Sequence, residues 1–151
     1  MMDHTTFTTR TDRLVEIIEA DAALQQLFGQ RVYIGKGLRR LDMEQYSVWV
    51  HRVRVDDYGY WMGRPGTDLN ATWAVTCIAR RFGDPEGLEE DLSRLVAHVA
   101  SVLLQCKQDA LWTVMQLQGS EAVMMRDEAD GTQYYEIEPI LVRLEWEEQE
   151  D

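Results

Sequence analysis

Residues 134–151 read YYEIEPILVRLEWEEQED, and most of this stretch predicts a long β-strand. Alternation of apolar side chains with a period of two residues is the pattern of a strand. The apolar residues are Ile137, Pro139 and Leu141 on one face and Ile140, Val142, Leu144 and Trp146 on the other. We expect this strand to complete a sheet and to end in the acidic residues Glu147, Glu148, Glu150 and Asp151.

The segment before this strand predicts its antiparallel partner. Residues 120–127 (SEAVMMRD) are followed by Asp130-Gly131, a dipeptide typical of tight hairpin turns. We therefore expect residues 120–127 and 134–146 to form a β-hairpin. Residues 110–118 are ambiguous, because their apolar residues fit either a strand or a helical turn.

Three further segments predict strands, because they are rich in valine and aromatic residues. They are residues 31–35 (RVYIG), 46–55 (YSVWVHRVRV) and 72–82 (TWAVTCIARRF). In the second segment, Val48, Trp49 and Val50 are apolar on both faces, whereas Arg52 and Arg54 share one face further along. One end of that strand should be buried and the other half solvated.

Three stretches predict helices from their apolar periodicity. The first covers residues 9–20, with Thr9 as its cap and residues 1–8 flexible before it. The second is short, capped by Asp21 and closed by Gly29. The third follows a turn at residues 83–87, with Asp84 as cap and Pro85 at its first position, and reaches Leu104. Its polar face carries Glu89, Glu90, Asp91, Arg94 and His98.

The order of these segments predicts an α+β fold in a single domain covering residues 1–151. Helix, strands, helix and strands follow one another without βαβ alternation, which favours a mostly antiparallel mixed sheet. We expect the long helix and the N-terminal helix to pack against it. Residues 147–151 form an acidic tail.

Residues 56–71 (DDYGYWMGRPGTDLNA) lack periodicity and predict a long loop. Loops of this length in a compact domain are usually functional or disordered. The grouping of Tyr58, Tyr60, Trp61 and Met62 fits an interaction surface. It fits equally a loop that folds its own aromatic side chains inward.

The charge of the chain excludes some classes of partner. There are 27 acidic and 15 basic residues, which gives a net charge of −12. Nucleic-acid-binding surfaces need clustered Lys and Arg, and anionic membranes also attract basic residues. We therefore expect no specific nucleic-acid binding and no membrane association.

The N-terminal residues and the cysteines predict the location of the protein. The polar N-terminus predicts no signal peptide, and Cys77 and Cys106 are expected to be free thiols in a cytoplasm.

No catalytic or metal-binding pattern stands out. His4, His51 and His98 have no Cys, Asp or Glu at the spacing of metal ligands. His98 shares a helix face with Asp91 and Arg94, a grouping that most often is simply solvated. We expect no enzyme activity, no metal and no cofactor.

Taken together, the segments resemble the tail terminator (tail completion) proteins of long-tailed bacteriophages, the group that includes the lambda-type minor tail protein U. The resemblance covers nearly the whole chain. One feature is the amphipathic stretch TDRLVEIIEADAALQQLFG leading to RVYIG; another is the closing hairpin EAVMMRDEADGTQYYEIEPILVRLEWEE. A third is the unit TWAVTCIARRFGDPEGLEEDLSRLVAHV, in which a strand near a Thr-Trp pair passes through a Pro-containing turn into a long helix, as in the family.

The resemblance implies a structural protein of the virion, located in the tail at the neck and assembled in the host cytoplasm. Members of the family form a hexameric ring on the completed tail tube and stop its polymerisation. The ring joins the tail to the head-tail connector, or neck, proteins. DNA passes through its lumen without being specifically bound, and the family uses no cofactor.

Two groups of residues are candidates for contacts within such a ring. An acidic lining would repel DNA phosphates, but the same acids could equally be a solvated tail. The lumen or ring-face candidates are Asp127, Glu128, Asp130, Glu147 and Glu148. Candidates for a subunit or partner interface are Arg52, Arg54, Tyr58, Tyr60, Trp61, Arg64, Arg80 and Arg81.

Three alternatives stay open at this point. One is a head-side neck component, such as a stopper or tail-joining protein, which would bind portal-adaptor complexes in place of tail tubes. Another is a small enzyme, regulatory or binding domain of similar build, which would carry a metabolite or metal. The last is an assembly chaperone, which would bind an unassembled partner and be missing from the finished particle.

Overall fold

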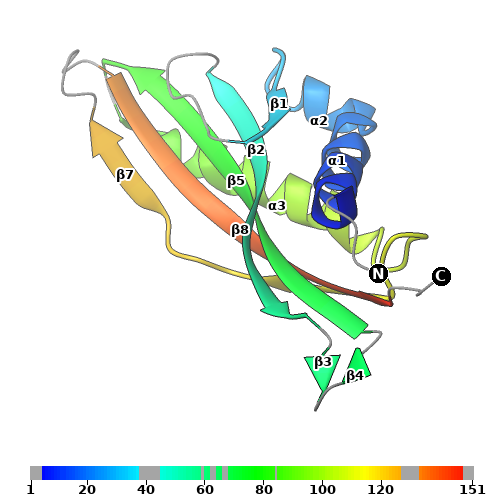
Figure 1. The fold of residues 1–151 in the computed structure, drawn as a ribbon. Coiled ribbons are helices and arrows are strands. Elements are labelled where there is room, and N and C mark those ends of the chain that lie inside the picture. Colours follow the sequence, from blue (N-terminus) through cyan, green and yellow to red (C-terminus); the bar gives the residue numbers. More distant parts are fainter. Residues whose placement is uncertain are drawn as a thin grey trace.

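In a computed structural model, the chain folds as an α+β domain, as predicted (Figure 1). The structure describes residues 5–37, 45–58, 60–61, 64–65, 68–83, 85–126 and 133–147. Its helices are α1 (Thr5–Glu19), α2 (Ala22–Gln26) and α3 (Leu88–Leu104). Its strands are β1 (Tyr33–Lys36), β2 (Tyr46–Asp57), β3 (Tyr60–Trp61), β4 (Arg64–Pro65), β5 (Asp68–Phe82), β6 (Val114–Gln118), β7 (Val123–Arg126) and β8 (Gln133–Glu147).

The main sheet has six strands in the order β1-β2-β5-β8-β6, and β7 also pairs with β8. β1 runs parallel to β2, and the other pairs are antiparallel, so the sheet is mixed but mostly antiparallel. The predicted hairpin is confirmed as β7 and β8, and the ambiguous residues 110–118 contain strand β6. β3 and β4 form a separate two-stranded ribbon at one end of the molecule (Figure 1).

The centre of the sheet is the pair β5 and β8, each 15 residues long. They pair without a register shift from Asp68 opposite Glu147 to Phe82 opposite Gln133. One face of the pair belongs to the main core. It carries the β8 residues that the alternation placed on one face, Ile140, Val142, Leu144 and Trp146, together with Trp73, Val75, Cys77 and Ala79 of β5. Burying one large aliphatic side chain contributes about 1.5–3 kcal/mol, so this face contributes a large part of the stability.

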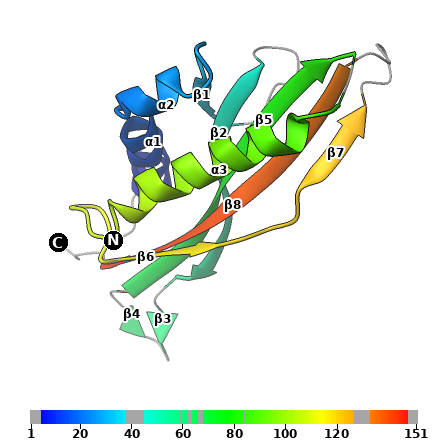
Figure 2. The same cartoon turned by 180° about the vertical axis from the view of Figure 1, so that it is seen from behind.

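Helices α3 and α1 cover that face, with α3 lying diagonally along the sheet (Figure 2). The buried residues of α3 recur at helical spacing and are Leu88, Asp91, Leu92, Leu95, Val99, Val102 and Leu103. α1 is attached through Trp73, whose Nε1 donates to Thr11 Oγ1 at 2.8 Å, and through Arg10, which stacks on the Trp146 ring at 4.0 Å. The predicted packing of both helices is therefore confirmed.

A second, smaller core cluster occupies the opposite face of the sheet, which we call the helix-free face. It contains Trp49, Ile78, Tyr135 and Ile137, all less than 7% exposed, with Tyr33 packed against them. Gly35 makes room for this cluster. A Cβ atom at Gly35 would lie 2.9 Å from Tyr33 Cε1 and 3.0 Å from Trp49 Cζ3.

The predicted start of the first helix was wrong, because α1 begins at Thr5 and not at Thr9. Residues 5–8 are therefore helical and not a flexible lead. A contact distant in sequence accounts for the extension: the Phe7 ring packs edge-on against the Trp146 ring, with centroids 5.9 Å apart. Asp12 lies in mid-helix and forms an ion pair with Lys36 at 2.7 Å.

The predicted cap of α3 was also wrong. The helix starts at Leu88, and its N-cap is Gly87 in the left-handed conformation (φ 82°), so Pro85 is not its first residue. A Cβ at Gly87 would lie 3.0 Å from the Arg81 guanidinium, which packs against the turn. Asp84 lies outside the described residues.

The polar face of α3 is less solvated than its sequence pattern predicted. Asp91 is buried, because its Oδ2 accepts a hydrogen bond from the Tyr46 hydroxyl at 2.9 Å and another from Arg81 Nε at 3.3 Å. His98 contacts Asp21 Oδ2 at 2.8 Å and ties α3 to the start of α2, so it is not grouped with Asp91 and Arg94. Asp21 itself caps α2 as predicted, by accepting from the Ala23 N–H.

The predicted loop at residues 56–71 is largely strand. β2 continues to Asp57 and β5 begins at Asp68, so regular pairing takes up both ends of the segment. The β3–β4 ribbon occupies part of the interval, where Trp61 pairs with Arg64. Asp56 and Asp57 therefore belong to a strand and not to a loop.

Replacing Gly35 with alanine should destabilise the fold. The added Cβ overlaps the Tyr33 and Trp49 rings, and overpacking of this kind costs about 1–3 kcal/mol. Gly119→Ala is a matched control, since nothing lies within 4 Å of its Cβ position, and its effect should stay below about 1 kcal/mol. Urea unfolding of the two variants measures the difference, and equal stabilities would contradict the packing described for Gly35.

Candidate assembly interfaces

The first candidate interface is the outer edge of β2. β1 has 4 residues and β2 has 12, and β1 pairs only with Ser47–Val50. Beyond Val50, no described strand pairs with β2 on this side. The Val50 carbonyl points toward β1, because it accepts from the Gly37 N–H at 2.9 Å. Alternate residues of a strand present their backbone groups to the same side, so Arg52 directs its N–H and C=O outward.

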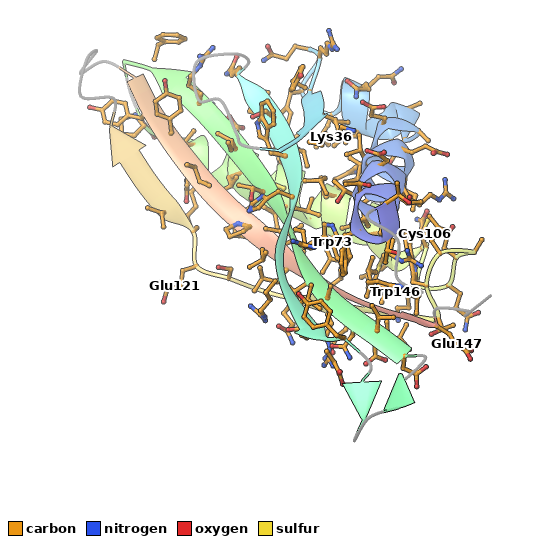
Figure 3. The ribbon with its side chains drawn as sticks, in the orientation of Figure 1. Lys36, Trp73, Cys106, Glu121, Trp146 and Glu147 are labelled. Atoms are coloured by element: carbon orange, nitrogen blue, oxygen red, sulfur yellow. The ribbon has the colours of Figure 1, made fainter. Side chains whose placement is uncertain are left out.

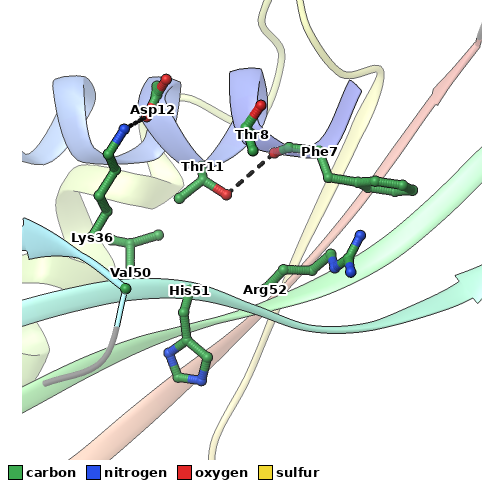
Figure 4. A pocket seen from close by; sticks show the side chains of 9 residues that line it. Phe7, Thr8, Thr11, Asp12, Lys36, Val50, His51 and Arg52 are labelled. Carbon is green, nitrogen blue, oxygen red and sulfur yellow. Dashed lines mark hydrogen bonds and ion pairs between the residues drawn. The ribbon is translucent and has the colours of Figure 1, made fainter. Parts of the chain in front are cut away.

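A groove of about 690 Å³ lies where β1 ends, between α1 and this edge (Figure 4). Its lining comes from three elements: Phe7, Thr8, Thr11 and Asp12 of α1, Lys36 and Gly37 at the end of β1, and Val50, His51 and Arg52 of β2. The Lys36–Asp12 ion pair bridges β1 and α1 within the groove lining. The His51 ring points away from α1, toward the helix-free face (Figure 4).

Arg52, a predicted interface residue, lies in the groove lining. Its guanidinium stacks over the Phe7 ring at 4.5 Å and its side chain is exposed. No carboxylate within the described ranges forms an ion pair with it. The positive charge of Arg52 is therefore available for an external partner.

Arg54, another predicted interface residue, is held within the chain. Its Nε donates to Asp56 Oδ1 at 2.7 Å, and Thr72 Oγ1 donates to Asp56 Oδ2 at 2.6 Å. Burial acts to raise the pKa of the Asp56 carboxyl, but the hydrogen bonds from Thr72 and Arg54 outweigh it and hold the pKa below its usual value. The β2–β5 pairing shifts register twice, after Arg52 and after Val55. These hydrogen bonds connect the two strands in the same region.

The predicted pair Arg80 and Arg81 is divided between the two faces of β5. Arg81 lies on the helix side and bonds to buried Asp91 and to the Glu86 carbonyl. Arg80 stacks over the Phe82 ring at 5.3 Å, and Phe82 is 61% exposed at the end of the strand. Arg81 therefore braces the turn before α3, while Arg80 and Phe82 stay near the surface.

The remaining predicted residues are only partly described. Tyr58 is 53% exposed just after β2, and Glu147 is exposed at the end of β8. The backbones of Tyr60, Trp61 and Arg64 form the β3–β4 ribbon, but their side chains lie outside the description. The acids outside the described residues are Asp127, Glu128, Asp130 and Glu148.

The opposite side of the sheet has a second open edge, which sequence reasoning did not identify. β6 and β7 pair one after the other along β8, and no described strand covers their outer sides. Val114, Val123 and Met124 are 44%, 52% and 54% exposed on this edge. Glu121, between the two strands, points away from the body of the molecule (Figure 3). The residues were visible in the sequence, but their edge position depends on strand order.

The helix-free face also carries a depression of about 530 Å³. Its floor is made of β5 and β8, from Ala74, Thr76, Ile137, Pro139 and Leu141. Its sides are made by His51 and Val53 from β2 and by Ser120, Glu121 and Val123 from the second edge. Exposed Val53 and Val123 thus face a shared apolar hollow.

Within the described residues, no group of three His, Cys, Asp or Glu side chains is placed to hold a metal ion. Cys77 and Cys106 are both unpaired, and burial raises the pKa of the Cys77 thiol well above its usual value. Among the helices described, none has the length and apolar character needed to cross a lipid bilayer.

The fold, in contrast to the sequence, has a counterpart among known proteins. No protein-family model and no curated protein matches the chain by sequence. Among solved structures, it is similar to a chain in the structure titled "Virion of native gene transfer agent (GTA) particle", at 15% identity. The TM-score is 0.54, and the match covers 88% of this chain and 92% of the other. The two chains therefore share a fold over nearly their whole lengths.

Asp56→Asn should weaken the far end of β2. Because the pKa of Asp56 is lowered in the folded state, the carboxylate stabilises the fold above its unfolded pKa, and this contribution is lost as pH falls through the folded pKa. We expect a loss of about 1 kcal/mol at pH 7. The difference from the unmodified chain should shrink below about pH 4.

Thermal or urea unfolding between pH 3 and 7 measures this effect. Asp68→Asn, at an exposed position at the start of β5, is the matched control and should show little change at any pH. A loss that is the same at pH 3 and pH 7 would contradict the ionic role of Asp56.

Proposed function

We propose that this chain is a structural protein of a phage-like virion, and that it forms a ring capping the tail tube. The observation that carries the proposal is the fold shared with a chain of a gene transfer agent virion over 88% of this chain. The resemblance of its segments to tail terminator proteins supports the same role. In this role the ring stops tube polymerisation and presents the surface that joins the tail to the neck.

Ring formation is supported by two sheet edges that no described strand covers. A ring needs head-to-tail contacts, in which one patch of a subunit meets a different patch of the next. The β2 edge and the β6–β7 edge lie on opposite sides of one sheet, as such contacts require. Unpaired edges also favour unwanted association, so a protein that exposes two of them gains by covering both in an assembly.

The charge of the chain supports passage of DNA without binding. A net charge of −12 repels phosphates, and an acidic lumen keeps a duct from retaining the DNA that moves through it. Glu147, exposed at the end of β8, is a candidate for the lumen or a ring face. So are Asp127, Glu128, Asp130 and Glu148, which lie outside the described residues.

The proposed partners are further copies of the chain in a hexameric ring, the tail-tube protein below it and a head-tail connector protein above it. No catalysis and no cofactor belong to this role. Tyr58, Tyr60, Trp61 and Arg64 lie at the end of the molecule that carries β3 and β4, where they are proposed to contact the tube or the neck. Assembly takes place in the host cytoplasm and ends in the virion.

The purified protein should form rings when it is concentrated with its cognate tail-tube protein. Negative-stain images should show rings at tube ends, and light scattering should give a mass that is a multiple of the 17.6 kDa chain. Tubes should also stay shorter when the chain is added during polymerisation.

Two results would contradict this function. Binding to portal-adaptor complexes in place of tubes would indicate a stopper or tail-joining protein. Binding to unassembled tube subunits, with no chain left in finished particles, would indicate a chaperone. Mass spectrometry of purified particles separates the last case from the others.

A further inference from the structure

We propose that the ring closes by sheet extension, in which the outer edge of β2 in one subunit binds the β6–β7 edge of a second copy of the chain. This inference rests on the proposed ring and adds the contact that builds it. The receiving side is the β2 edge beyond Val50 with the groove beside α1. The inserted side is Val114–Arg126, which contains both short edge strands.

The receiving side has the features that strand addition requires. Binding of an added strand uses main-chain hydrogen bonds for affinity and pockets beside the strand for specificity. Arg52 directs its backbone N–H and C=O outward, and the groove continues the line of β1 past Gly37. Phe7 and Thr11 of α1 line the groove and would contact side chains of the incoming strand (Figure 4).

Each of the two inserted strands is short enough for this space, and both edges expose apolar side chains. β6 has 5 residues and β7 has 4, while β2 runs from Arg52 to Asp57 beyond its pairing with β1. Val114, Val123 and Met124 are exposed on the inserted edge, and Val53 is 44% exposed on the receiving strand. Pairing the two edges would remove these apolar side chains from water, which favours association.

Charge complementarity selects the orientation. Arg52 forms no ion pair within the described residues, and Glu121 likewise has no described partner. Each is exposed, one at the receiving edge and one between the inserted strands. Opposite charges placed across an interface fix its register and suppress wrong pairings. The structure therefore assigns Arg52 of one subunit to Glu121 of the next.

The two edges are placed so that the contact can repeat. Figure 1 shows β7 and the α1–β1 side at opposite sides of the sheet, and Figure 3 labels Glu121 and Lys36 on those two sides. A contact between different patches leaves the second patch of each subunit free for the next copy. Repetition with rotation closes a ring, whereas pairing of two identical edges would end at a dimer.

The decisive experiment is a charge swap in the full chain. Arg52→Glu and Glu121→Arg should each weaken ring assembly about tenfold or more, because each places like charges together. The double variant should recover rings. Lys107→Glu and Glu19→Arg are matched controls, since they make the same charge reversals at exposed positions outside both edges and should leave assembly unchanged. Light-scattering mass and negative-stain ring counts at one protein concentration are the readouts.

Hydrogen exchange of the unmodified chain gives a test that depends on no variant. Amides of residues 51–57 and 114–126 should exchange more slowly in assembled rings than in dilute monomer, because new main-chain hydrogen bonds protect them. Circular dichroism confirms that each charge variant is folded before its assembly is scored.

The outcomes separate this inference from the proposed function. Rings that persist in both single variants, or single defects that the double variant does not correct, would overturn the Arg52–Glu121 contact while leaving the ring role intact. A particle of only two chains would indicate pairing of identical edges and would also overturn it. An unmodified chain that forms no ring, even with the tube protein, would overturn the proposed function itself.

Discussion

The uninterrupted pairing of β5 with β8 is the interaction on which the rest of the structure depends. Both strands are 15 residues long and stay in register from end to end. Their alternating side chains supply apolar surface to both faces of the sheet, so the main core forms on one face and the smaller Trp49 cluster on the other. The helices and the other strands of the sheet then add to this pair, directly or through β2.

The same central pair leaves the sheet unfinished at its sides. On one side, β1 covers only part of β2; on the other, β8 is shared between the short strands β6 and β7. One chain therefore combines an apolar core with two sheet edges that no described strand covers. In the proposed ring, association would complete the main-chain hydrogen bonding that these edges leave open.

The basic side chains predicted for interfaces differ in whether they pair within the chain. Acids outnumber bases 27 to 15, and a net charge of this size favours solubility. Of the basic side chains predicted for interfaces, Arg54 and Arg81 are held by Asp56 and Asp91 within the chain. Arg52 stacks on Phe7 and forms no ion pair with a carboxylate among the described residues. Three arginines that look equivalent in sequence thus take different roles in the fold.

The sequence by itself determined the α+β class, the β7–β8 hairpin, the C-terminal end of α3 and the inward face of β8. Local periodicity was sufficient for these, because it reports which side of an element is buried. Only the tertiary structure decided the rest. α1 begins at Thr5 because Phe7 packs on Trp146, and Asp91 is buried because Tyr46 and Arg81 reach it. Of the residues in the proposed contact, Arg52 was named from the sequence but Glu121 was not, and the sheet edges were not identified. Those edges result from the order of strands in the sheet. Contacts between residues far apart in the chain set that order, and no local pattern of side chains encodes it.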